Sequence, residues 1–361
     1  MEFSEILQNF VLNFLSIVWE ALPFIIVGAV IAGILEELLP QQALSKLLPR
    51  HFLPAVLIGG ALGLIFPMCE CGIVVVMRRL LKKGLPLSCC IAYMLAGPIL
   101  NPIVLGSTAV AFFPHGQDIG WAVLLLRAGI GYLVACVTGL VVHYLVGKWG
   151  MKEMLTPTAL PPAPPKGGLS LGMADAPAAP EPKKPFRERL SNISATALND
   201  FIDITVFLII GSLLSALVKS DPNLINNVEA MSRQNPILAV PLLMGLAFVL
   251  CLCSEADAFL AASFKSMSLS AKLAFLVYGP MLDIKLLLMY TRVFRPKLIG
   301  VIVACVAVQV FIYSVAVHYI LPPMTGPVPA PSLAPAEPQS PTPTTGTPPT
   351  TAPTNTQPTN K

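Results

Sequence analysis

Eight long apolar runs constrain the fold of this chain more than any other feature. They lie near residues 10–35, 52–77, 85–113, 119–146, 193–218, 236–262, 269–291 and 298–321. A helix of about 20 apolar residues spans the hydrocarbon core of a bilayer. Hydrophobic residues make up 55% of the 361 residues and charged residues only 12%, against roughly 25% charged residues in a soluble domain. The sequence therefore predicts an all-α, polytopic membrane protein with about eight spanning segments.

Two proline-rich stretches divide the chain into four predicted parts. These are a first membrane half (1–152), a linker (153–188), a second membrane half (189–322) and a Pro/Thr-rich tail (323–361). Such compositions cannot bury a core, so we expect the linker and the tail to be extended and mobile. No basic region with a cleavage site precedes the first apolar run, which is therefore expected to serve as the insertion signal.

Basic residues flank the apolar runs and do not form a stripe, so nucleic-acid binding has no support. Residues 78–83 and the linker are rich in Lys and Arg. The positive-inside rule predicts that both are cytoplasmic, and the N-terminus with them. The basic residues between 292 and 297 would then lie outside if each later segment crossed once. This conflict favours a re-entrant segment, and it leaves open whether the halves are parallel or inverted.

A motif of cysteines and acids recurs inside two of the apolar runs. Pro67-Met68-Cys69-Glu70-Cys71-Gly72 lies in the second run, and Cys251-Leu252-Cys253-Ser254-Glu255-Ala256-Asp257 lies in the sixth. Cys251 follows Cys69 by 182 residues, and the same offset carries Gly97-Pro98-Ile99-Leu100-Asn101 onto Gly279-Pro280-Met281-Leu282-Asp283. Two motifs with one gapless offset predict an internal duplication of the membrane part.

The residue types of the first motif favour a soft ion. Thiolates prefer Cu(I), Zn(II) or trivalent arsenicals, and carboxylates add charge. A charge near the bilayer centre needs a bound cation, a proton or a basic partner, for which Lys265 and Lys285 are candidates. The predicted metal ligands are Cys69, Glu70, Cys71, Cys251, Cys253, Glu255 and Asp257. We expect no tightly bound cofactor, and a soft metal ion only as cargo.

The Gly-Pro motifs predict helices that break within the membrane. Proline removes a backbone donor and clashes with the preceding turn. Asn101 is then predicted to cap a new helix that has Pro102 at its first position, and Asp283 to cap the matching helix. Broken helices at corresponding positions of two halves are typical of a transporter binding site. Asn101, Asp283 and Lys285 are therefore predicted to lie on the substrate pathway.

These motifs resemble those of a known family. Residues 67–72, the basic segment 78–84 and residues 96–102 resemble the bacterial predicted-permease family that includes the ArsP-type organoarsenical exporters and YraQ. Residues 253–259 and 279–283 resemble a branch described as copper/zinc efflux transporters. The resemblance covers both membrane halves and implies a multi-pass permease of the inner (plasma) membrane.

The function predicted from these features is export of a soft metal or metalloid, with no enzymatic activity. A copper or zinc cation is favoured because the second motif is rich in acids, and a trivalent organoarsenical is the alternative. A membrane thiol oxidoreductase and a non-transporting assembly or sensor protein are alternatives of other classes. The expected partners are the lipid bilayer, the metal or metalloid and, as an open option, a second copy of the chain.

Overall fold

The computed structural model describes a helical protein. It covers residues 3–38, 51–65, 68–157, 159, 186–219, 227–228, 230–232, 235–264 and 267–320. Within these ranges the only extended pairing is one bridge between Leu155 and Phe294. The predicted tail, Lys265 and residues 160–185 of the predicted linker lie outside the described residues. The prediction of an all-α, polytopic membrane protein is confirmed.

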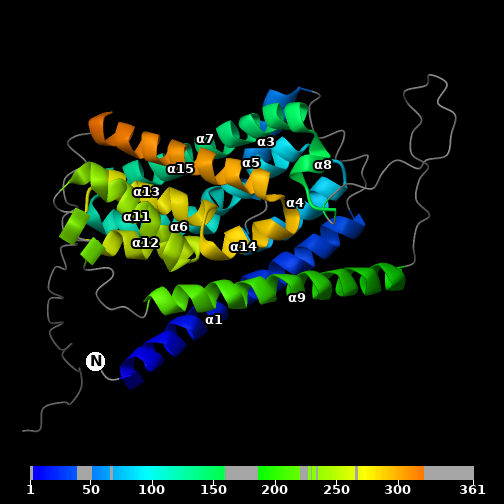
Figure 1. Cartoon of the computed structure of the whole chain (residues 1–361), viewed down its shortest axis with the longest axis horizontal. Helices are drawn as coiled ribbons and strands as arrows, with labels where there is room; N and C mark the ends of the chain where they lie inside the picture. Colours follow the sequence, from blue (N-terminus) through cyan, green and yellow to red (C-terminus); the bar gives the residue numbers. More distant parts are fainter. Residues whose placement is uncertain are drawn as a thin grey trace, which may run out of the picture. The chain divides into compact units, whose positions relative to one another are not determined.

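The helices form two series along the chain (Figure 1). The first series is α1 (Phe3–Leu38), α3 (Phe52–Ile65), α4 (Glu70–Lys82), α5 (Leu87–Leu100), α6 (Pro102–Phe112), the 3-10 turn η1 (Phe113–His115), α7 (Gln117–Trp149) and α8 (Met151–Met154). The second series is α9 (Phe186–Lys219), α11 (Pro236–Leu250), α12 (Ser254–Ser263), α13 (Leu269–Met281), α14 (Ile284–Val293) and α15 (Pro296–Ile320). A shift of 182 residues carries the bounds of α1, α3, α4, α5 and α6 to within three residues of those of α9, α11, α12, α13 and α14.

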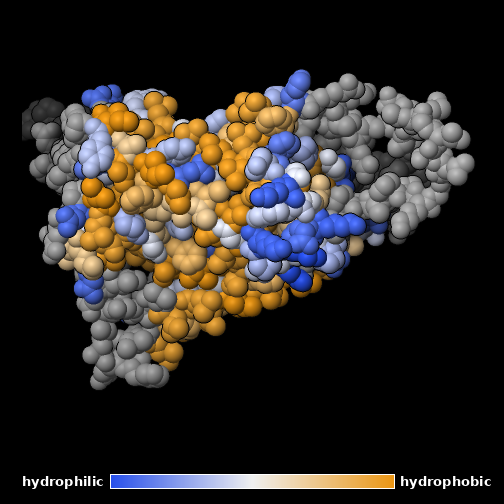
Figure 2. Space-filling view, turned by 45° about the horizontal axis from the view of Figure 1, so that its top comes forward, coloured by the Kyte–Doolittle hydropathy of each residue, from blue (hydrophilic) through white to orange (hydrophobic). Residues whose placement is uncertain are grey.

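Six of the eight predicted segments are long and apolar enough to cross a membrane in the described part of the chain. The other two, 52–77 and 236–262, are each divided into a pair of short helices, α3–α4 and α11–α12. Large apolar side chains such as Leu15, Leu198 and Val308 are exposed on α1, α9 and α15. On the face in Figure 2, hydrophobic residues form a broad surface between hydrophilic patches at its two ends. Such a surface suits contact with lipid.

The helix breaks follow the recurring motifs. α3 and α4 are separated by residues 66–69, and α11 and α12 by residues 251–253. Cys251 ends α11 in the left-handed conformation (φ 48°), which β-carbon contacts make unfavourable by roughly 1–2 kcal/mol. Pro98 and Pro280 lie inside the last turns of α5 and α13, and the residues that cap the next helices, Asn101 and Asp283, come three residues after each proline.

Contacts between turns define one end of the bundle, which we call the basic end. Glu153, beyond α7, pairs with Lys297 at 2.9 Å, and the backbone N–H of Arg295 donates to the Met154 carbonyl at 2.9 Å. Arg78, near the end of α4, lines a cavity together with Arg292 of α14. The α4/α5 turn, the end of α7 and the α14/α15 turn therefore meet here.

The opposite end of the bundle holds the corresponding turns. The 33 residues of α7 extend about 50 Å, so its start lies far from the basic end. There His115 of η1 interacts electrostatically with Lys272 of α13, which places the α6/α7 turn beside the start of α13. The α12/α13 turn is thus at the opposite end, although its counterpart, the α4/α5 turn, is at the basic end. The two helix series are consequently inverted relative to each other.

The short helix pairs form two re-entrant hairpins. Phe52 at the start of α3 stacks on His143, near the end of α7, with ring centroids 4.6 Å apart. α3 therefore enters from the basic end and α4 returns to it, whereas α11 and α12 make the equivalent excursion from the opposite end. Because the second hairpin does not cross the bundle, residues 292–297 lie at the basic end. This resolves the conflict over these basic residues, for which the sequence favoured a re-entrant segment.

The start of α1 lies at the opposite end, which corrects one expectation. Ile204 and Phe207 of α9 lie beside Arg78, so α9 begins at the basic end. α1 runs antiparallel to α9, because Gly33 near its end packs on Ile193 near the start of α9. The prediction that the N-terminus shares a side with residues 78–83 is wrong. It counted residues 52–77 as a crossing, whereas this segment is a hairpin.

Candidate functional site

Four discontinuous helices begin in the interior of the bundle and define the candidate site. They are α4, α6, α12 and α14, and each starts directly after a break. α4 packs against α14, and α6 packs against α12, so both contacts join the two series. Helix N-termini carry partial positive charge and unpaired N–H groups. Side chains in the first turns of these helices therefore determine what the centre can bind.

A buried ion pair joins α4 to α14. The Lys285 Nζ lies 3.0 Å from Glu70 Oε1 and 3.5 Å from Asp283 Oδ2, and these side chains are at most 1% exposed. The Ser254 hydroxyl donates to Glu70 Oε2 at 2.8 Å. Both oxygens of Glu70 are thus satisfied by residues of the second series. Lys285 is the basic partner that the sequence suggested for this acid.

The predicted helix caps are confirmed. Asn101 Oδ1 accepts the backbone N–H of Ile103 at 2.9 Å and caps α6. Asp283 Oδ1 accepts the backbone N–H of Leu286 and caps α14, at 2.6 Å. Asp283 therefore has two partners, since one oxygen holds the helix start and the other faces Lys285. Asn101 is buried at the start of α6.

Arg127 is a central residue that the sequence reasoning missed. Its Nη1 donates to Thr108 Oγ1 of α6 at 2.6 Å, and its Nη2 donates to the Ser254 carbonyl of α12 at 3.0 Å. The guanidinium is completely buried and interacts electrostatically first with Asp257 and then with Glu255. An arginine within the apolar run 119–146 was the available signal, because intramembrane charges are usually functional.

Two acids of the second motif carry unused oxygens. Asp257 is buried, and a β-carbon on Gly279 would lie 3.0 Å from its Oδ2. This Oδ2 and both carboxylate oxygens of Glu255 are buried without a hydrogen-bond partner among the described residues. A buried carboxylate oxygen without a donor is costly. These oxygens are the part of the cluster best able to take a proton or a cation.

The four cysteines of the motifs lie around the ion pair. Cys71 and Cys69 are hydrogen-bonded through their sulfurs, and Cys71 interacts electrostatically with Lys285. Cys253 interacts electrostatically with Lys285 and with Glu70 and Cys71 of the first series.

The remaining motif cysteine lies at a helix start. The Cys251 sulfur accepts from the backbone N–H groups of Lys285 and Ile284, at the start of α14. No group of three or more His, Cys, Asp or Glu side chains in the described ranges is arranged to hold a metal ion. The predicted residues nevertheless interact with one another in one region around Glu70 and Lys285.

The architecture and this buried polar centre define the class of the protein: a multi-pass membrane permease. Comparison with known proteins gives the particular family. The chain belongs to a family described as predicted permease, whose model matches residues 6–319. The resemblance inferred from the motifs is therefore confirmed at the level of the family.

Two bacterial relatives are similar over nearly their whole length. UPF0718 protein YcgR of Bacillus subtilis is 34% identical over 305 residues, which are 84% of this chain and 95% of the relative. A Streptococcus mutans protein, named as a subunit of a two-component membrane permease complex, is 33% identical over 315 residues, 87% of this chain and 96% of that protein. No solved structure matches the chain significantly.

Proposed function

We propose that this permease exports a soft metal or metalloid ion across the bacterial inner membrane by alternating access at the Glu70–Lys285 centre. The observation that carries the proposal is the position of Cys71 and Cys253, from the two series, beside this pair at the meeting point of four broken helices. Thiols are the preferred ligands of soft ions. The positive-inside rule assigns the basic end to the cytoplasm.

Lys285 gives the proposed transport cycle a charge-balanced empty state. An uncompensated carboxylate is costly in a low-dielectric interior, so Glu70 must keep a positive partner. In this structure that partner is Lys285. An arriving cation would bind the thiols and Glu70 and displace Lys285, whose amino group remains beside Asp283. Glu255 and Asp257 would balance the added charge or carry exchanged protons.

The acids distinguish a metal cation from the alternative cargo. A trivalent organoarsenical binds thiols without bringing a net charge, so it needs Cys71 and Cys253 but not the unused oxygens of Asp257. Replacement of Asp257 by Asn should therefore reduce transport of copper or zinc and leave arsenical resistance in place. Loss of both activities in this variant would argue that Asp257 serves the structure instead.

The test measures how much metal accumulates in cells. Cells that express Cys71→Ser or Cys253→Ser should accumulate more copper or zinc than cells with the unchanged protein. Cys305→Ser is the matched control, since Cys305 is a half-buried residue of α15 whose sulfur is outside the centre. Export that is equal in all three variants would overturn the role of the thiols.

Two other classes have an observation in their favour. The hydrogen-bonded pair of Cys69 and Cys71 favours a thiol oxidoreductase, and trapping of free thiols before and after oxidant would detect its disulfide. The name of the Streptococcus mutans relative favours a role as one subunit of a complex. Flux in native membranes but not in proteoliposomes with the purified chain alone would support that role.

A further inference from the structure

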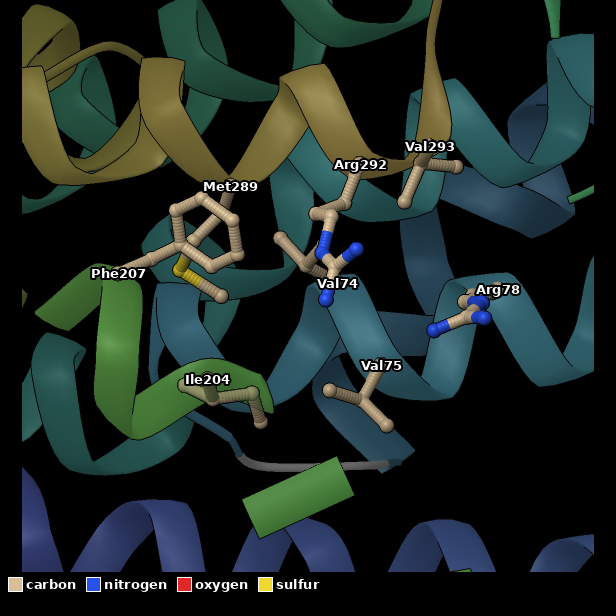
Figure 3. A pocket seen from close by; sticks show the side chains of 8 residues that line it. All are labelled: Val74, Val75, Arg78, Ile204, Phe207, Met289, Arg292 and Val293. Atoms are coloured by element: carbon tan, nitrogen blue, oxygen red, sulfur yellow. The ribbon is translucent and has the colours of Figure 1, made fainter. Parts of the chain in front are cut away.

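We propose that the route between the cytoplasm and the Glu70–Lys285 pair runs between α4, α9 and α14, and that Val74, Phe207 and Met289 close it. This inference rests on the proposed permease function and specifies the path that serves its centre. Its starting point is a small cavity of about 30 Å³ toward the basic end. The cavity is lined by Val74, Val75, Arg78, Ile204, Phe207, Met289, Arg292 and Val293 (Figure 3).

On α4, the face that carries Glu70 continues into the cavity wall. Val74 and Arg78 follow Glu70 by four and eight residues, which places all three on one face of the helix. At 1.5 Å per residue, Arg78 lies about 12 Å from Glu70 along the axis. The wall therefore leads from the centre toward the basic end.

On α14, the face that carries Lys285 also continues into the cavity wall. Met289 and Arg292 follow Lys285 by four and seven residues, again on one helix face. The two helices that form the ion pair thus also form the cavity, and α9 closes its third side with Ile204 and Phe207.

The cavity is a constriction and not an open channel. A volume of about 30 Å³ holds a single water molecule. In Figure 3, Phe207 and Met289 lie together at one end and Arg78 at the other, with Arg292 and Val74 between them. The Arg292 guanidinium lies 5.5 Å from the centroid of the Phe207 ring. Rotation of the Phe207 and Met289 side chains would widen the passage without moving a helix.

The corresponding helices at the opposite end are joined by a side-chain bridge. The 182-residue offset relates α4, α9 and α14 to α12, α1 and α6. There α12 and α6 are joined by Arg127, which binds Thr108 and Ser254 at once. Ile25, the counterpart of Phe207, is buried, whereas Phe207 is only partly buried. The two ends therefore differ here, since the basic end has a small cavity between these helices and the opposite end has an arginine that bridges the corresponding helices.

Labelling of introduced cysteines tests the route without any cargo. Inside-out vesicles containing Val74→Cys or Met289→Cys are treated with a membrane-impermeant methanethiosulfonate, and peptide mass spectrometry identifies the labelled position. We expect both to react several-fold faster than Ile25→Cys, the counterpart of Phe207 at the opposite end. Equal labelling at the three positions, or none at 74 and 289, would overturn the route.

A bulky substitution tests whether the passage carries flux. Met289→Trp should abolish most copper or zinc flux in proteoliposomes, whereas Val308→Trp, on the lipid-facing side of α15, should retain it. Wild-type flux in Met289→Trp would contradict the route. If the unchanged protein moves neither metal, the proposed function fails, while the labelling pattern still decides the route. If Met289→Trp does not fold, the labelling of the introduced cysteines still tests the route.

Discussion

A buried lysine holds the centre of this protein together at the scale of single residues. Lys285 contacts one acid from each helix series, Glu70 and Asp283. The sequence indicated both acids and suggested Lys285 as a partner, because charged residues in an apolar run need compensation. It did not indicate the contacts of Arg127, whose partners Thr108 and Ser254 lie 19 and 127 residues away along the chain. Contacts of that separation depend on how the helices pack.

The Lys285–Glu70 pair should be strongly coupled in stability measurements. Lys285→Met leaves the Glu70 charge buried without its partner, and we expect a loss of about 3–5 kcal/mol in the free energy of unfolding. The double variant Glu70→Gln, Lys285→Met should recover much of this loss. Chemical denaturation in detergent micelles measures these two variants and the single variant Glu70→Gln. Additive losses in the double variant would show that the pair is not the source of the effect.

Helix starts are the elements that shape the site. The motifs around Asn101 and Asp283 predicted two of the four starts, since a capping side chain after a proline is a local signal. The starts of α4 and α12 have no side-chain cap at Cys69 or Cys253. The two short helix pairs were consequently predicted as continuous segments, because apolar composition alone does not reveal a break.

Two substitutions should separate the two roles of Asp283, the cap of α14 and the charge beside Lys285. Asp283→Asn keeps an acceptor for the Leu286 N–H but removes the charge beside Lys285. Asp283→Ala removes the cap as well, which costs about a further 1 kcal/mol of stability. The free energies of unfolding of the two variants, measured in detergent, give this difference. Equal stability of the two would mean that the cap hydrogen bond contributes nothing.

Glycine allows α9 to approach α14 at the centre. A β-carbon on Gly211 would lie 2.6 Å from the Lys285 Cβ and 2.8 Å from its Cα. Gly211→Ala should therefore push the helices apart and destabilise the protein by about 1–3 kcal/mol. Gly245→Ala on α11 is the control, because nothing lies within 4 Å of its added β-carbon. Helix propensity alone would favour Ala over Gly at both positions, so a Gly211→Ala variant as stable as Gly245→Ala would show that the contact with Lys285 does not limit packing.

The inverted arrangement of the two series determines the topology of the whole molecule. Six segments of spanning length and two hairpins place both termini of the described helices, Phe3 and Ile320, opposite the basic end. Alkaline phosphatase and a fluorescent protein report on which side of the membrane a fusion point lies. Fusions before residue 3 and after residue 320 should report the same side. A reporter inserted near residue 170 should give the other side. One shared side for all three positions would contradict the inverted arrangement.

A surface contact at the basic end should respond to pH. The hydrogen bond from Lys297 lowers the pKa of Glu153 below its ordinary value of 4.5. A lowered carboxyl pKa stabilises the folded state above the ordinary value, and this stabilisation is lost as the pH falls through the folded pKa. Exchange of the Thr156 N–H, which donates to the Val293 carbonyl, should therefore speed up in acid relative to its intrinsic rate. Glu153→Gln should remove this pH dependence, and an unchanged profile would exclude the pair as its cause.

The sequence by itself determined the class of fold, the family and the residue types of the centre. Apolar length, proline breaks and capping residues act over a few neighbours, so one chain without relatives is enough to read them. Only the tertiary structure decided that residues 52–77 and 236–262 turn back as hairpins, that the series are inverted, and that Arg127 joins α6 to α12. These features depend on which helix faces bury one another, and hydrophobic composition is the same for a helix that crosses a membrane and for one that returns.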